Sequence, residues 1–146
     1  VPEPELVLVI SSTGKITGYS IGNDMSSRSI EGENPLYLPQ AKMYDGSAAI
    51  GPCVLLTEEP ISPSTIIAIK IERNNTIVFE GSVTIDQMKR THAELVSFLY
   101  REYSFAVGAY LMTGTCVVPD NNFTLQSGDV ITINIGGIGD LVNTVA

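Results

Sequence analysis

Two carboxylates open the chain at a spacing that could hold a divalent cation. Glu3 and Glu5 stand one residue apart at the head of the apolar stretch VPEPELVLVI. In an extended chain, side chains two positions apart point to the same face, so both carboxylates lie on one side of a strand. Like charges held together in this way call for a cation between them. For the pair alone, two solvated residues at a frayed strand end are the favoured interpretation.

A third oxygen ligand is available in the segment GYSIGNDMSSR. Asp24 ends a strand-like stretch, KITGYSIGNDMS, which follows ELVLVIS after a predicted tight turn at Ser12-Thr13-Gly14. If the hairpin turns near residue 13, position 24 lies opposite position 2 or 3. Three carboxylates then share one end of one sheet. Such an all-oxygen set suits Mg²⁺, Mn²⁺ or Ca²⁺ better than Zn²⁺, which prefers histidine and cysteine.

The elements that must position these residues are mainly strands. AAIGPCVLLT is an apolar run in which Pro52 indicates an edge strand or a bulge. TIIAIKIERNNTIVFEGSV alternates apolar and polar residues on both sides of Asn74-Asn75, which predicts a hairpin. GTCVV, DVITINIGGIG and LVNTV are expected to be short strands, with a sharp turn at the glycines of GGIG.

One helix is expected, in THAELVSFLYREY. Thr91 and Glu94 stand at the spacing of a capping box, which marks a helix start. The apolar stripe that would pack on the sheets is Leu95, Val96, Leu99 and Tyr103. His92, the only histidine, lies at the start of this helix and is expected to be structural. The predicted fold class is therefore mainly β, with one helix capping a barrel or rolled sheet.

Composition restricts the class of protein. The chain has 146 residues, 44% of them hydrophobic, which is enough for one core and one domain over residues 1–146. With a net charge of −8 and no run of basic residues, neither nucleic acid nor a membrane is an expected partner. No apolar run approaches the ~18 to 20 residues of a spanning helix, and a cytoplasmic location is expected. Cys53 and Cys116 are expected to be buried free thiols, and the start at Val1 suggests a preceding segment.

A longer stretch of the sequence carries motifs that resemble those of a known family. GYSIGNDMSSRSIEGENPLYLPQAKMYDGSAAIGP, with E-x-E before it and LMTGTCVVPDNNFTLQSGDVITINIGGIGDLVN after it, resembles the fumarylacetoacetate hydrolase superfamily. The catalytic domain of that superfamily carries E-x-E, an Asp ahead of S-x-R, a Lys, T-G-T, G-D and G-x-G-x-L-x-N in this order. The insert IEGENPLYLPQAK and the T-G-T-C-x-x-P text are similar to its sugar-acid branch. The resemblance implies a mixed β-roll or barrel and a homodimer or homotetramer.

The resemblance also implies roles for single residues. The metal ligands of the family fall on Glu3, Glu5 and Asp24, the same residues that the spacing indicates. Its catalytic lysine matches Lys42 in PQAKMYD, which would donate a hydrogen bond to a developing oxyanion or move a proton. A surface lysine after a proline-rich turn is the alternative for Lys42.

Four further residues match positions that contact substrate in the family. Arg28 of S-x-R would brace the loop or bind oxygens of the substrate, and Ser26 flanks the site on the same turn. Glu31 stands where the hydrolases have Gln, which departs from a hydrolase-type oxyanion pocket. Thr115 of TGT would bind a substrate carboxylate, with a core strand threonine as the alternative.

The function implied by this resemblance is metal-dependent dehydration of a 2-keto-3-deoxy sugar acid. The expected reaction converts 2-keto-3-deoxy-D-arabinonate to 2,5-dioxopentanoate through an enolate stabilised by Mg²⁺, with Mn²⁺ or Ca²⁺ as other possible ions. Lys42 would serve as acid or base, and a segment upstream of E-x-E would supply the second group. Two alternatives stay open: hydrolysis of a β-diketo acid of the fumarylacetoacetate or acylpyruvate type, and a non-catalytic β assembly module.

Overall fold

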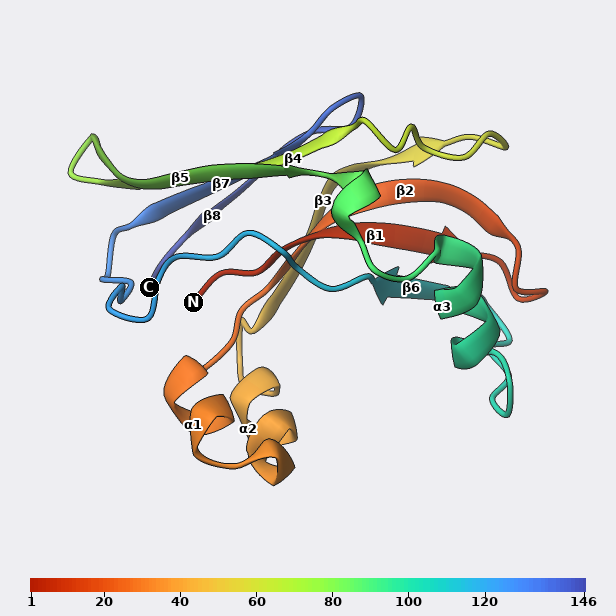
Figure 1. Cartoon of the computed structure of the whole chain (residues 1–146), viewed down its shortest axis with the longest axis horizontal. Helices are drawn as coiled ribbons and strands as arrows, with labels where there is room; N and C mark the ends of the chain where they lie inside the picture. Colours follow the sequence, from red (N-terminus) through yellow and green to blue (C-terminus); the bar gives the residue numbers. More distant parts are fainter.

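Two four-stranded antiparallel sheets form the molecule (Figure 1), described for all 146 residues by a computed structural model. The first sheet has the strand order β3-β2-β1-β6, and the second has the order β5-β4-β7-β8. The strands are β1 (Pro4–Ile10), β2 (Ile16–Asp24), β3 (Ala48–Leu56), β4 (Ile66–Arg73), β5 (Thr76–Thr84), β6 (Ala109–Met112), β7 (Val130–Ile135) and β8 (Gly139–Thr144). The predicted mainly β fold class is confirmed.

The core lies between the two sheets and follows a period of two along the chain. Leu6, Leu8 and Ile10 of β1 are buried, whereas the intervening positions face the other side of the sheet. Isoleucines recur in the same way in the second sheet, at positions 67, 69 and 71 of β4 and at positions 131, 133 and 135 of β7. Because side chains alternate along a strand, one face of each sheet supplies a continuous apolar layer. The opposite face of β1 is left for the glutamates.

The hairpin that joins β1 to β2 has the predicted register. Gly14 turns the chain with a φ of +79°, and its N–H donates to the carbonyl oxygen of Ser11 at 2.9 Å. Pro4 pairs with Asn23, and the N–H of Asp24 donates to the carbonyl oxygen of Glu3 at 3.0 Å. Position 24 therefore lies beside position 3, as the sequence predicted.

Of the other local predictions, two are confirmed and two are wrong. Asn74 and Asn75 form the predicted two-residue turn, both with positive φ, and β3 with Pro52 lies at a sheet edge. The prediction of a strand at GTCVV is wrong, because β6 ends at Met112 and the next residues leave the sheet. Gly114 adopts a φ of +91° and donates its N–H to a side chain instead of a neighbouring strand. The two cysteines are free but exposed, not buried.

The prediction of a single helix is also wrong. The helical elements are α1 (Arg28–Glu33), η1 (Pro35–Tyr37), α2 (Leu38–Lys42), η2 (Ile85–Gln87) and α3 (His92–Leu99). Helices α1 and α2 belong to the segment that joins β2 to β3 and form a small lobe at one end of these strands (Figure 1). Each helix is too short to show an apolar periodicity. Helix α3 begins as predicted, with the Thr91 hydroxyl accepting from the N–H of Glu94. None of these helices is long and apolar enough to cross a membrane.

Candidate metal centre

Three carboxylates converge at one end of the first sheet. One oxygen of each of Glu3, Glu5 and Asp24 lies within 4.8 Å of the others. Glu3 and Glu5 project from the face of β1 opposite the core, and the hairpin register brings Asp24 of β2 alongside. Glu5 is the most buried of the three residues, with only 3% of its surface exposed. Spacing along β1 and pairing with β2 therefore suffice to assemble the cluster.

Lys42 completes this cluster from a distant part of the chain. Its Nζ donates to Oε2 of Glu3 at 2.6 Å and to Oδ2 of Asp24 at 2.7 Å. The carbonyl oxygen of the buried Ala41 accepts from the N–H of Ser27, which fixes the end of α2 beside the end of β2. The side chain of Lys42 is 21% exposed, so the alternative of a free surface lysine does not describe it.

The charges of the cluster favour retention of the ammonium. Burial disfavours a charged lysine, but the hydrogen bonds to Asp24 and Glu3 outweigh it and raise the pKa of Lys42 above its ordinary value. Lys42 is therefore present as an ammonium that can donate hydrogen bonds. The cluster contains one ammonium and three carboxylates, so its net charge is negative when all four groups are ionised.

The pKa of Glu5 is shifted mainly by burial and further by the neighbouring carboxylates. Burial raises the pKa of Glu5 to about 7, and the charges of Asp24 and Glu3 act in the same direction. A hydrogen bond of 2.6 Å from the Gly114 N–H to Oε2 opposes the shift. A divalent cation held by the three carboxylates would favour the ionised form of Glu5, and hard oxygen ligands are what Mg²⁺ prefers. The residues present therefore fit a magnesium ion.

The T-G-T segment borders the cluster. The Thr113 hydroxyl donates to the carbonyl oxygen of Leu6 at 2.9 Å, which attaches the segment to β1. The Thr115 hydroxyl oxygen, by contrast, is buried and has no hydrogen-bond partner within the chain. A buried polar atom without a partner costs free energy that a ligand atom can recover. Thr115 lies outside any strand, so the alternative of a core strand threonine is wrong.

The remaining predicted substrate contacts lie around the cluster, with other partners. The guanidinium of Arg28 donates to the carbonyl oxygens of Pro119 and Asp120, so it braces the loop that follows T-G-T. Ser26 is buried, and its hydroxyl donates to the carbonyl oxygen of Asp24. Glu31 is exposed on α1, and its side chain makes no hydrogen bond or ion pair. The structure does not bring Glu31 into the cluster.

Two asparagines, neither of which was assigned a role from the sequence, link the cluster to the second sheet. Oδ1 of Asn23 accepts from the N–H of Glu3 at 3.3 Å, and Nδ2 of Asn23 donates to Oδ1 of Asn143 at 3.0 Å. Asn23 is 1% exposed, so its orientation is set by these two partners. The signal for Asn143 was its place at the end of GGIGDLVN, two residues after the core-facing Leu141.

We expect Asn143→Ala to weaken Mg²⁺ binding by about tenfold, because groups that orient metal ligands typically change metal affinity by that order. The substitution leaves Nδ2 of Asn23 without its acceptor and frees Asn23 to turn away from Glu3. Asn143→Asp keeps an oxygen at the same position and should restore most of the affinity. Calorimetric titration of both variants, beside the exposed Asn134→Ala as control, checks this. Equal affinity in all three proteins would contradict a positioning role.

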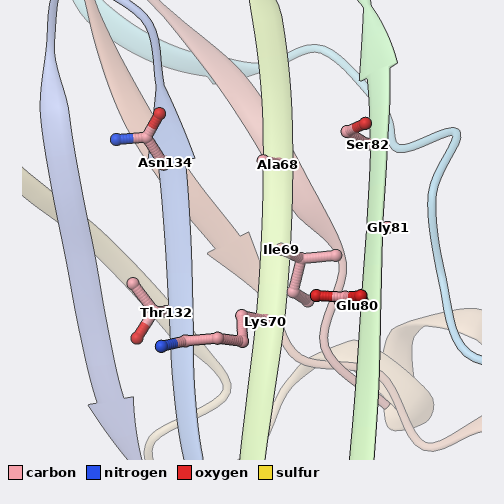
Figure 2. Close-up of a pocket in the computed structure, with 8 residues that line it drawn as sticks. All are labelled: Ala68, Ile69, Lys70, Glu80, Gly81, Ser82, Thr132 and Asn134. Carbon is pink, nitrogen blue, oxygen red and sulfur yellow. The ribbon is translucent and has the colours of Figure 1, made fainter. Parts of the chain in front are cut away.

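A separate hollow of about 460 Å³ lies on the outer face of the second sheet (Figure 2). Its lining residues come from three strands, among them Lys70 of β4, Glu80 of β5 and Thr132 of β7. Glu80 is the only carboxylate in this lining, so the hollow has no set of metal ligands. The carboxylate cluster on the first sheet, by contrast, offers three such ligands.

Comparisons with known proteins agree with this geometry. Residues 3–146 match the family described as "Fumarylacetoacetate (FAA) hydrolase C-terminal". The chain is 47% identical over 146 residues to the "Probable 2-keto-3-deoxyxylonate dehydratase" of Haloferax volcanii, covering 99% of this chain and 50% of that relative. It is 43% identical over 145 residues to the "2-dehydro-3-deoxy-D-arabinonate dehydratase" of Saccharolobus solfataricus, covering 99% of this chain and 49% of that relative.

A solved structure is also similar. The structure described as "2-keto-3-deoxy-D-arabinonate dehydratase complexed with magnesium and 2,5-dioxopentanoate" matches with a TM-score of 0.95 and 43% identity. The match covers 99% of this chain and 52% of that one. The chain thus spans about half the length of the curated relatives it matches.

Proposed function

The chain belongs to the fumarylacetoacetate hydrolase family, and on that premise we propose that it is the catalytic domain of a magnesium-dependent dehydratase of 2-keto-3-deoxy sugar acids. The reaction is loss of water from 2-keto-3-deoxy-D-arabinonate to give 2,5-dioxopentanoate. The observation that carries the proposal is the cluster of Glu3, Glu5 and Asp24 with Lys42 bound to it. The likeness to two dehydratases of 2-keto-3-deoxy sugar acids supports this choice of reaction.

The three carboxylates are proposed to hold the ion. When bound, Mg²⁺ supplies a Lewis acid that polarises the carbonyl group of a 2-oxo acid and makes its C3 proton acidic. Glu3, Glu5 and Asp24 would hold the ion at the end of the first sheet, and Thr115, with its unpartnered hydroxyl, directly follows the Gly114 whose N–H donates to Glu5. That hydroxyl donates a hydrogen bond to the substrate carboxylate and so sets which face of the acid meets Lys42.

Lys42 acts on the charge that develops during proton loss. Its Nζ lies within hydrogen-bond distance of Glu3 and Asp24, so an oxygen bound at the cluster lies within its reach. Donation from this ammonium stabilises the negative charge that appears on the keto oxygen as C3 loses its proton. Departure of the C4 hydroxyl as water and a proton shift from C5 then give the aldehyde.

Assembly as a homodimer or homotetramer and a cytoplasmic location stay predictions.

The test is product analysis with 2-keto-3-deoxy-D-arabinonate and Mg²⁺. We expect loss of one water per substrate, an aldehyde product that carbonyl reagents trap, and exchange of the C3 protons with D₂O by NMR. Chelation of the ion with EDTA should stop all three. Cleavage of an acylpyruvate into two acids, without water loss from the sugar acid, would support the hydrolase instead. Absence of any ion binding would leave only the non-catalytic module.

A further inference from the structure

A second cavity adjoins the carboxylate cluster. It measures about 290 Å³, and its wall includes Lys89, Arg90 and the segment Thr113–Cys116. Gly114 belongs to both places, because it lines the cavity and donates its N–H to Oε2 of Glu5 at 2.6 Å. A ligand whose head is held by the carboxylates would enter this cavity if its tail passed Gly114. The unpartnered hydroxyl of Thr115 lies on the same wall.

The charges of the cavity differ from those of the rest of the chain. The protein carries a net charge of −8, yet no carboxylate lines this cavity and two cations do. Lys89 and Arg90 form no ion pair and no side-chain hydrogen bond within the chain. The other basic side chains all have partners: Lys15, Arg28, Lys42, Lys70, Arg73 and Arg101. Two unpaired cations on one wall make this cavity suited to an anion.

We propose that the cavity is a distal subsite for an oxyanion at the far end of a 2-oxo acid whose keto-acid head is bound at the carboxylate cluster. The proposal rests on the proposed function, because it uses the same head group and the same metal ligands. Lys89 and Arg90 donate hydrogen bonds to the tail, and a carboxylate accepts them more strongly than a hydroxyl or a methyl group does. Five-carbon dicarboxylic 2-oxo acids are therefore expected to bind more tightly than monocarboxylic ones of equal length, and to compete with the sugar acid.

Binding of a dicarboxylic acid should also be coupled to the ion. The carboxylate of Glu5 accepts the N–H of Gly114, which lines the cavity. When ionised, this carboxylate repels an anion bound in the cavity. A divalent cation held by Glu3, Glu5 and Asp24 would offset that repulsion. The affinity for a dicarboxylic acid is therefore expected to rise with Mg²⁺ more than its chelating head alone accounts for.

The test compares 2-oxoglutarate with 2-oxopentanoate, which share the head and the chain length and differ in the charge of the tail. Calorimetric titration in Mg²⁺ is expected to give about tenfold tighter binding of 2-oxoglutarate, the order expected of charge-assisted hydrogen bonds. In a Lys89→Gln/Arg90→Gln variant this ratio should fall toward one. A Lys70→Gln/Arg101→Gln variant removes the same charge outside the cavity and should keep the ratio.

A second readout follows occupancy of the cavity. Cys116 lines the cavity and is exposed, whereas the exposed Cys53 lies on β3 outside it and serves as an internal reference. Bound 2-oxoglutarate should slow alkylation of Cys116 by iodoacetamide relative to Cys53, and the Lys89/Arg90 variant should lose this protection. Equal affinity for the two acids with an unprotected Cys116 would overturn the subsite and leave the dehydratase intact. Absence of metal-coupled binding of either acid would overturn the proposed function itself.

Discussion

Replacing Glu5 with glutamine is expected to lower the affinity for Mg²⁺ by at least about 100-fold, because a neutral amide is a far weaker ligand for a hard cation than a carboxylate. Glu5 is the only one of the three carboxylates that is buried. Glutamine keeps the shape of the side chain and an oxygen that accepts the Gly114 N–H. The loss is therefore expected in binding, and not in folding. Calorimetric titration with Mg²⁺, with and without 2-oxobutyrate, measures it.

The same substitution has an opposite effect on stability without metal. Burial raises the pKa of Glu5 to about 7 in the folded chain, from 4.5 in a solvated glutamate. Between these two pH values the folded state holds a proton that the unfolded state has lost, so the free energy of unfolding falls as the pH rises. Above pH 7 the ionised Glu5 costs the apo-protein on the order of 1 to 3 kcal/mol. Glu5→Gln removes this cost.

Urea unfolding in EDTA at pH 5 and pH 8 tests that sign. The native chain should lose stability between the two values, and Glu5→Gln should lose less. Glu58→Gln, at a side chain that is 89% exposed, is the matched control and should behave like the native chain. By the same linkage, Mg²⁺ binding should weaken below pH 7, where the ion must displace a proton from Glu5. Undiminished Mg²⁺ binding by Glu5→Gln would rule out the cluster as the metal centre.

Replacing Lys42 with methionine is expected to separate metal binding from turnover. The ammonium occupies oxygens of both Glu3 and Asp24, so its removal should leave the affinity for Mg²⁺ unchanged or higher. Loss of a donor to the developing charge typically lowers turnover by about 10² to 10³-fold. Exchange of the C3 protons of 2-oxobutyrate in D₂O, followed by NMR, reports this step directly.

Two further substitutions sharpen the interpretation of Lys42. Lys42→Arg keeps the charge but places a planar, bulkier donor at the cluster, and we expect it to restore little of the exchange rate. Lys70→Met removes a lysine paired only with Glu72 on the second sheet and should leave exchange unchanged. A Lys42→Met protein that exchanges protons at the native rate would exclude Lys42 from catalysis. One that no longer binds Mg²⁺ would assign it to assembly of the cluster.

The sequence by itself determined those features that depend on local spacing. The E-x-E pair shares a face because side chains alternate along a strand, and the Ser12-Thr13-Gly14 turn sets the register that brings Asp24 to Glu3. The turn at Asn74-Asn75 and the start of α3 follow equally from residues close together in the chain. Lys42 was placed by family resemblance alone, since nothing in its spacing shows that α2 returns to the end of β2.

Only the tertiary structure decided which distant groups meet. Asn23 and Asn143 are 120 positions apart, and they touch because β2 and β8 come from different sheets that pack across one core. The packing of separate segments likewise decides three other features. These are the contact of Arg28 with the loop at Pro119, the unpartnered hydroxyl of Thr115, and the cavity at Lys89 and Arg90. Local spacing sets the direction of a side chain relative to its own strand. It carries no information about which other strand, helix or loop the folded chain places opposite, because that choice is made by burial of the whole apolar core.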